Sequence, residues 1–80
     1  MRKIEPKRPY QHFKGNLYYV HDIYEHTETQ ELMVAYQALY EPYHMSVRPL
    51  EMFVEKVEEN RKDNITNQKY RFEIFRGLTF

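Results

Sequence analysis

Apolar residues alternate with other residues over residues 32–40, and this period of two constrains the fold more than any other feature of the chain. Side chains of an extended strand point alternately to opposite faces, so the pattern predicts a strand with one buried face. The pattern breaks at Glu41-Pro42 and resumes over residues 45–48, which predicts a turn and a shorter strand. Pro49 then suits the first position of a helix, because its missing amide proton costs nothing there. Apolar residues at helical spacing extend this predicted helix over residues 49–57.

Two earlier runs are also rich in residues that favour strands. The first begins near Tyr10 and ends in a turn at Gly15-Asn16, two residue types that tolerate a positive φ. The second, residues 17–26, carries apolar side chains on both faces. We expect a bulge near His21-Asp22, which would bring Ile23 to the inner face.

Residues 27–30 have the length of a hairpin loop, so we expect the strands on either side of it to pair antiparallel. A last strand is predicted where Tyr70, Phe72 and Ile74 alternate with charged residues, after a polar loop over residues 60–68. Together these elements predict a mainly β protein with one short helix. Its architecture is expected to be a small, strongly bent antiparallel sheet or a Src-homology-3-like barrel.

A chain of 80 residues makes a single domain with a small core, here expected over residues 10–76. A flexible basic arm over residues 1–9 and a tail over residues 77–80 are expected to flank it. Cys is absent, so we expect eight Tyr and five Phe to supply the packing. The sequence has no run of 18 apolar residues and no apolar run after its first basic residues. We therefore expect no membrane span and no signal peptide, and a cytoplasmic protein.

The charges sum to zero but are sorted along the chain. Residues 1–15 carry five basic residues against one acid, and residues 61–80 carry five against two. Residues 16–60 carry nine acids against two basic residues. We expect the basic ends to shield the acidic middle or to keep the protein soluble, and attraction to a polyanion is the alternative.

Several short motifs follow one another between residues 10 and 57. They are YQHFKG at residues 10–15, HTET at 26–29, ALY at 38–40 and VRPLEMF at 47–53, with Leu17-Tyr18, Val20, Val34 and Tyr36 between them. Their order and spacing resemble domain-of-unknown-function family 1653, a group of small bacterial proteins. The resemblance implies a bacterial source and a small all-β, barrel-like fold, and it brings no established activity. The chain departs from the family pattern at Ser46, where Trp is usual, and at Gln30, where Gly is usual, and its C-terminal strand and tail lie outside the resemblance.

Few residues support catalysis or metal binding. Ser46 is the only Ser, and although His44 shares its strand face, no third group is evident to orient the pair. His21 and His26 point to opposite faces of a regular strand, so they cannot share an ion without a bulge between them. We therefore expect no enzymatic activity, no metal and no cofactor. The family pattern includes His12 and His26, which implies a hydrogen-bonding role for them at the base of the hairpin.

Arg48 is a charged residue in a stretch that is expected to be half-buried, so its guanidinium requires an acceptor. That acceptor is expected to be a carboxylate such as Glu25, Glu28 or Glu51, or else an anionic ligand. Tyr36 and Tyr40 are expected to pack in the core or at its rim, and a ligand-contacting surface that includes Tyr43 is the alternative. We expect a non-enzymatic binding or adaptor module whose partner is a protein or a small anionic ligand. The candidate ligand-binding residues are His12, Lys14, His26, Tyr36, Tyr43 and Arg48.

Binding of single-stranded nucleic acid is the alternative function, because basic residues are interleaved with aromatic ones at both ends of the chain. The neutral total charge and acidic middle count against it. Its candidate residues are Lys14, Lys69, Tyr70, Arg71, Phe72 and Arg76. A third hypothesis is an accessory or regulatory domain of an enzyme. Exposed Leu78 and Phe80 would support a homodimer, so both a monomer and a homodimer stay open.

Overall fold

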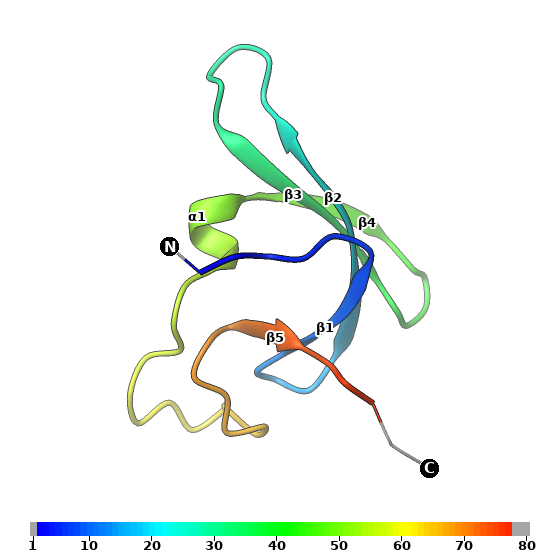
Figure 1. The fold of residues 1–80 in the computed structure, drawn as a ribbon. Coiled ribbons are helices and arrows are strands. Elements are labelled where there is room, and N and C mark those ends of the chain that lie inside the picture. The colour runs from blue at the N-terminus through cyan, green and yellow to red at the C-terminus, as the bar shows by residue number, and fades with distance from the viewer. Residues whose placement is uncertain (1, 78–80) are drawn as a thin grey trace.

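The computed structural model describes residues 2–77 and contains one five-stranded antiparallel sheet (Figure 1). One short helix follows the fourth strand, and the strands lie in the order β4-β3-β2-β1-β5. The prediction of a mainly β fold with a bent sheet is confirmed, and the sheet does not close, because its edge strands β4 and β5 do not pair. The elements are β1 (Arg8–His12), β2 (Leu17–Glu25), β3 (Leu32–Ala38), β4 (Met45–Pro49), α1 (Leu50–Phe53) and β5 (Phe72–Ile74).

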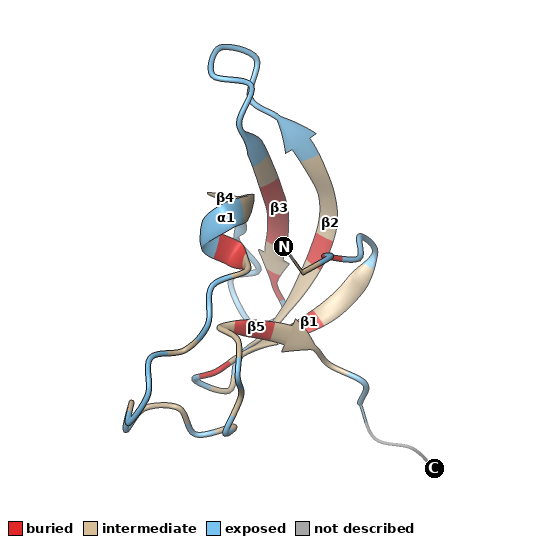
Figure 2. Cartoon of the chain, turned by 60° about the vertical axis from the view of Figure 1, so that its left-hand side comes forward, coloured by how far each residue is buried: buried red, intermediate tan, exposed pale blue. Residues whose placement is uncertain are grey.

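The hairpin of β2 and β3 projects beyond the rest of the molecule, and its tip is exposed (Figure 2). The register shifts between Val20 and Asp22, so the predicted bulge is confirmed. Ile23 consequently packs against the core, as expected. The hairpin loop is closed by the amide of His26, which donates to the carbonyl of Glu31 at 2.8 Å.

Aromatic rings fill the core on the inner face of the sheet. The alternating pattern of residues 32–40 predicts which side chains face inward. Of these, Val34, Tyr36 and Ala38 are buried, whereas Leu32 and Tyr40, at the two ends of the pattern, are exposed. The fully buried side chains among the described residues are Tyr10, Phe13, Val20, Val34, Phe53 and Phe72.

The segment after α1 folds back onto the segment before β5. Lys56 forms an isolated antiparallel bridge with Tyr70, and the amide of Arg71 donates to the carbonyl of Glu55 at 2.9 Å. This pairing explains why the helix, confirmed in its position, ends at Phe53 and not near residue 57. The last apolar residue of the predicted longer helix instead lies in an extended segment, which runs alongside the residues just before the last strand.

The segment before β1, which is expected to be a flexible arm, includes Ile4, a residue that is only 4% exposed and belongs to the core. The amide of Glu5 donates to the hydroxyl of Tyr10 at 2.8 Å, and the guanidinium of Arg2 donates to the carbonyl of Phe72. A single branched aliphatic residue thus anchors a polar segment across the ring cluster. The expected role of Leu78 and Phe80 in a homodimer concerns residues outside those that the structure describes.

Within residues 2–77, no helix is long and apolar enough to cross a membrane.

Candidate functional site

The ring of Phe72 in β5 is the centre around which the candidate site is built. It stacks on Phe53 with centroids 4.2 Å apart, and it meets Tyr18 and Tyr36 edge-to-face at 5.7 Å each. Edge-to-face and offset ring pairs of this kind each add about 0.5 to 1.5 kcal/mol to the burial of their area. The cluster therefore holds β2, β3, α1 and β5 in fixed positions, and the polar residues at its border are fixed with them.

His12, at the end of β1, lies over this cluster with its ring 4.9 Å from that of Phe72. Its Nδ1 accepts a hydrogen bond from the amide of Lys14 at 3.1 Å. Burial, followed by repulsion from Lys14, Arg48, Arg71 and Arg61, lowers the pKa of His12 to about 4. The ring is thus neutral at pH 7, and because Nδ1 accepts, Nε2 carries the proton and is a hydrogen-bond donor.

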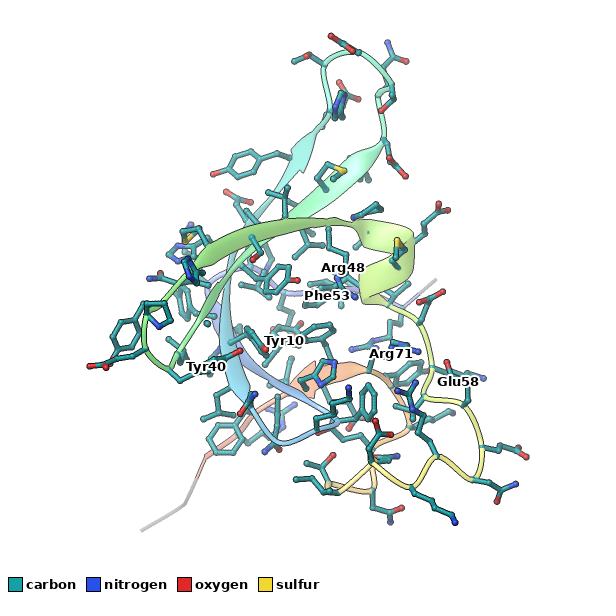
Figure 3. The ribbon with its side chains drawn as sticks, turned by 180° about the vertical axis from the view of Figure 1, so that it is seen from behind. Tyr10, Tyr40, Arg48, Phe53, Glu58 and Arg71 are labelled. Carbon is teal, nitrogen blue, oxygen red and sulfur yellow. The ribbon has the colours of Figure 1, made fainter. Side chains whose placement is uncertain are left out.

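Three of the four cations around His12 are neutralised by carboxylates. Lys14 lies 3.6 Å from Asp63, and Arg61 contacts Asp63 at 2.8 Å. Glu58 accepts hydrogen bonds from Arg61 at 2.7 Å and from Arg71 at 2.6 Å, which lower its pKa to about 2. Figure 3 shows Arg71 and Glu58 beside one another at the border of the loop after α1.

Arg48, in β4, is the fourth cation, and no carboxylate among residues 2–77 lies within ion-pair distance of it. The expected ion pair with Glu25, Glu28 or Glu51 is therefore not formed in the described part of the chain. Its guanidinium carbon lies 5.8 Å from the centre of the Phe72 ring, within the range of a cation–π contact. Arg48 is half-buried and, like neutral His12, lies against the Phe72 ring, with no acidic partner among the described residues.

Two tyrosines form the opposite border of the ring cluster. The hydroxyls of Tyr18 and Tyr40 are hydrogen-bonded at 2.8 Å, and their rings meet edge-to-face at 5.7 Å. Burial and this hydrogen bond raise the pKa of Tyr18 to about 12, so its phenol stays protonated. Tyr18 was not among the candidate residues, although its even spacing from Val20 places both on the core face of β2. We call Arg48, His12 and Tyr18, whose side chains all lie against the Phe72 ring, the Arg48 face, and Tyr40 borders it through Tyr18.

The structure brings only some of the candidate ligand-binding residues together. His12 and Arg48 both contact the ring of Phe72, whereas His26 lies in the exposed loop of the β2–β3 hairpin. There its Nδ1 lies 3.2 Å from the amide of Glu28, consistent with the hydrogen-bonding role that the resemblance implies. Tyr36 is 7% exposed and belongs to the core, as expected. Tyr43 is exposed in the turn between β3 and β4, with a positive φ.

The candidate nucleic-acid residues are mostly occupied by contacts within the chain. Phe72 is 1% exposed, so no base could stack on it. Tyr70 is covered by the guanidinium of Arg2 at 4.1 Å from its ring centre and by the amine of Lys69 at 5.5 Å. Arg71 and Lys14 are paired with carboxylates, and Arg76 is exposed at the border of a separate hollow.

Three hollows on the surface have volumes of about 590, 290 and 200 Å³, and none of the three is lined by His12 or Arg48. The largest is bordered by polar residues of the loop after α1, including Glu58, Arg61 and Asn64. None of these three hollows includes the Arg48 face. Among the described residues, no group of three His, Asp or Glu side chains is placed to hold a metal ion.

The fold defines a small protein with an open five-stranded antiparallel sheet and a core of aromatic rings. The family model described as protein of unknown function (DUF1653) matches residues 8–74, and the chain belongs to this family. The match includes β5, so the last strand is part of the family fold and not an addition to it.

A crystal structure of a DUF1653 family protein from Bordetella bronchiseptica is similar to this chain, with a TM-score of 0.75 and 28% sequence identity. The similarity covers 99% of this chain and 96% of the other. No curated protein matches the chain.

Proposed function

We propose that this protein is a non-enzymatic binding module that recognises an anionic group of its partner at the Arg48 face. The observation that supports this most directly is the half-buried guanidinium of Arg48, which has no carboxylate within ion-pair distance among the described residues. A half-buried charge gains from an acceptor of opposite sign, and a guanidinium matches a carboxylate or phosphate with two parallel hydrogen bonds.

His12 adds a second donor to the same surface. Its pKa of about 4 keeps the ring neutral at pH 7, and the hydrogen bond that Nδ1 accepts leaves the proton on Nε2. A neutral donor beside Arg48 can contact an anion without adding a second charge to be desolvated. A guanidinium and a neutral ring N–H suit an oxyanion with several acceptor atoms.

The positions of the three hollows favour a macromolecular partner over a small metabolite. Small-molecule sites are concave and enclose most of the ligand, whereas these hollows lie away from the Arg48 face. The ring of Tyr40, 42% accessible, offers apolar contact area beside Tyr18.

Titration of ¹⁵N-labelled protein with sodium phosphate against sodium chloride, at matched ionic strength and pH 7, tests the proposal. The side-chain Nε signal of Arg48 and the ring nitrogens of His12 should shift selectively with phosphate. The variant Arg48→Gln should lose the shifts of His12, whereas Arg61→Gln should keep them, because Arg61 is already paired with Glu58 and Asp63. Equal shifts at all arginines, or none at Arg48, would show that this face does not select anions.

A further inference from the structure

The strand β4 forms an edge of the sheet, so one side of its backbone lacks a strand partner among the described residues. Two of its side chains are among the most exposed apolar ones in the described chain, with Met45 55% and Val47 64% accessible. Arg48 belongs to the same strand, and because Ser46 and Arg48 alternate with these two residues, they point to the other face of β4.

The hydrogen bonds around β3 establish which backbone groups of β4 are free. The amide of Ala38 donates to the carbonyl of His44 at 3.0 Å, in the same register that pairs Tyr36 with Ser46 and Val34 with Arg48. Because directly hydrogen-bonded pairs alternate along an antiparallel ladder, the backbones of Ser46 and Arg48 face β3. The N–H and C=O groups of Met45 and Val47 consequently point away from the sheet.

Pro49 is consistent with this assignment. In the same register its nitrogen points away from β3, as those of Met45 and Val47 do. A proline in a sheet is tolerated where its nitrogen faces away from the neighbouring strand. The bond from the amide of Leu39 to the carbonyl of Leu17, 3.0 Å long, independently places the odd-numbered residues here on the β2 side of β3.

The opposite edge of the sheet, at β5, is partly covered by other segments of the chain. Ahead of β5, Lys56 bridges to Tyr70, and Arg71 donates its amide to the carbonyl of Glu55. Arg2 donates to the carbonyl of Phe72 in β5 itself. Proteins commonly cover or charge their sheet edges to prevent unwanted pairing, and within residues 2–77 no backbone segment covers the outward groups of β4.

We propose that the partner binds as an extended peptide that pairs with Met45 and Val47 of β4 and places a carboxylate against Arg48. This proposal rests on the proposed function and specifies how the anionic group is presented. Backbone hydrogen bonds to the free edge would supply affinity, and the side chains at alternate positions would supply specificity. A second copy of the chain fits less well, because β4 has no acid, and antiparallel self-pairing about Val47 would bring two Arg48 side chains together on one face.

Selection of a phage-displayed library of random ten-residue peptides on the full chain tests the proposal. The selected peptides should share an Asp or Glu within an alternating apolar pattern. One such peptide, synthesised with a fluorescent label, is then measured by anisotropy against wild type and variants. Arg48→Gln should weaken binding by about tenfold, the usual worth of a hydrogen bond to a charged group. Exchanging the peptide's acid for Lys should restore binding to Arg48→Glu.

The matched pair Val47→Pro and Val47→Thr separates backbone pairing from side-chain contact. Proline at position 47 removes the outward N–H and none of the donors that bond to β3, so Val47→Pro should weaken binding by about tenfold or more. Val47→Thr keeps the N–H and a similar shape, so binding should stay within about threefold of wild type. In wild type, the peptide should also slow amide exchange at Met45 and Val47, a result that does not depend on whether the proline variant folds.

The outcomes distinguish the two proposals. If Val47→Pro binds as Val47→Thr does, or if exchange at Met45 and Val47 is unchanged, strand pairing is wrong while a dependence on Arg48 keeps the proposed function. If binding is indifferent to Arg48→Gln, both are wrong. No selected peptide, or sedimentation as a dimer with Val47 already protected from exchange, would also overturn the peptide proposal.

Discussion

The rings of Phe53 and Phe72 are stacked nearly parallel, with an interplanar angle of 10°, and this contact joins α1 to β5 across the longest loop of the described chain. Both rings are fully buried. The contact closes the inner side of the open sheet, and Arg48 lies at its edge, 5.8 Å from the Phe72 ring centre. The site and the core therefore share one side chain.

Removing that side chain should unfold the domain. Phe72→Ala is expected to cost about 3 to 5 kcal/mol, which is comparable to the whole stability of a domain of this size. Circular dichroism with urea unfolding should show no cooperative transition, or one shifted to much lower urea. Tyr24→Ala, a change at a ring that is 57% exposed, should stay within about 0.5 kcal/mol of wild type. An unchanged urea midpoint for Phe72→Ala would contradict the core described above.

The backbone of β4 should show alternating protection in the free protein. We expect slow amide hydrogen exchange at Ser46 and Arg48, which face β3, and fast exchange at Met45 and Val47, which face solvent. Two-dimensional NMR after transfer into D₂O measures all four amides together. The reverse alternation would mean that the register of β4 on β3 is shifted by one residue.

His12 should make the stability depend on pH in a defined window. Its pKa is about 4 in the folded protein and near 6.5 when unfolded, so the unfolded chain binds more protons between these values. The contribution of neutral His12 is therefore complete above about pH 6.5, falls as the pH drops towards 4, and levels off below. Urea unfolding across pH 4 to 7 should show a smaller slope for His12→Asn, whose amide oxygen can still accept the Lys14 amide. Matching slopes for both proteins would argue against a half-buried neutral ring.

Ile4 should contribute to stability although it precedes the first strand. Ile4→Ala is expected to lower the free energy of unfolding by about 2 to 4 kcal/mol, because the side chain is 4% exposed within the ring cluster. Lys3→Ala next to it changes an exposed residue and should have little effect. Thermal unfolding of both variants provides the comparison. If the two variants unfolded alike, the segment before β1 would be an arm, as its composition predicts.

The strands could be predicted because period-two alternation identifies which side chains share a face. It correctly selected Val34, Tyr36 and Ala38 for the core. Alternation does not say how far along a strand the core extends, so Leu32 and Tyr40 were assigned to the same face and lie exposed at its ends.

Features that depend on distant contacts could not be predicted. The end of α1 at Phe53 follows from the pairing of Lys56 with Tyr70, which is absent from any local pattern. The burial of Ile4 similarly requires the ring cluster to exist first. Local sequence patterns predict a longer helix and a flexible N-terminal segment. Contacts between segments that are distant in the sequence instead end the helix early and bury one aliphatic side chain of the N-terminal segment.

The candidate site was predictable in its residue types but not in its geometry. Arg48 was selected as a charge in a half-buried stretch, and His12 through the family pattern, yet only folding brings both onto the ring of Phe72. Residue type alone does not separate core rings from surface rings. Phe72, considered as a stacking platform for nucleic acid, is instead the buried centre of the core.

The two edges of the sheet differ in how their backbone groups are used. In the described residues, the outward groups of Met45 and Val47 in β4 have no strand partner, whereas residues 69–71, ahead of β5, pair with residues 55–57. A strand added at β4 would therefore extend the described sheet from five strands to six, with the added strand as its new edge.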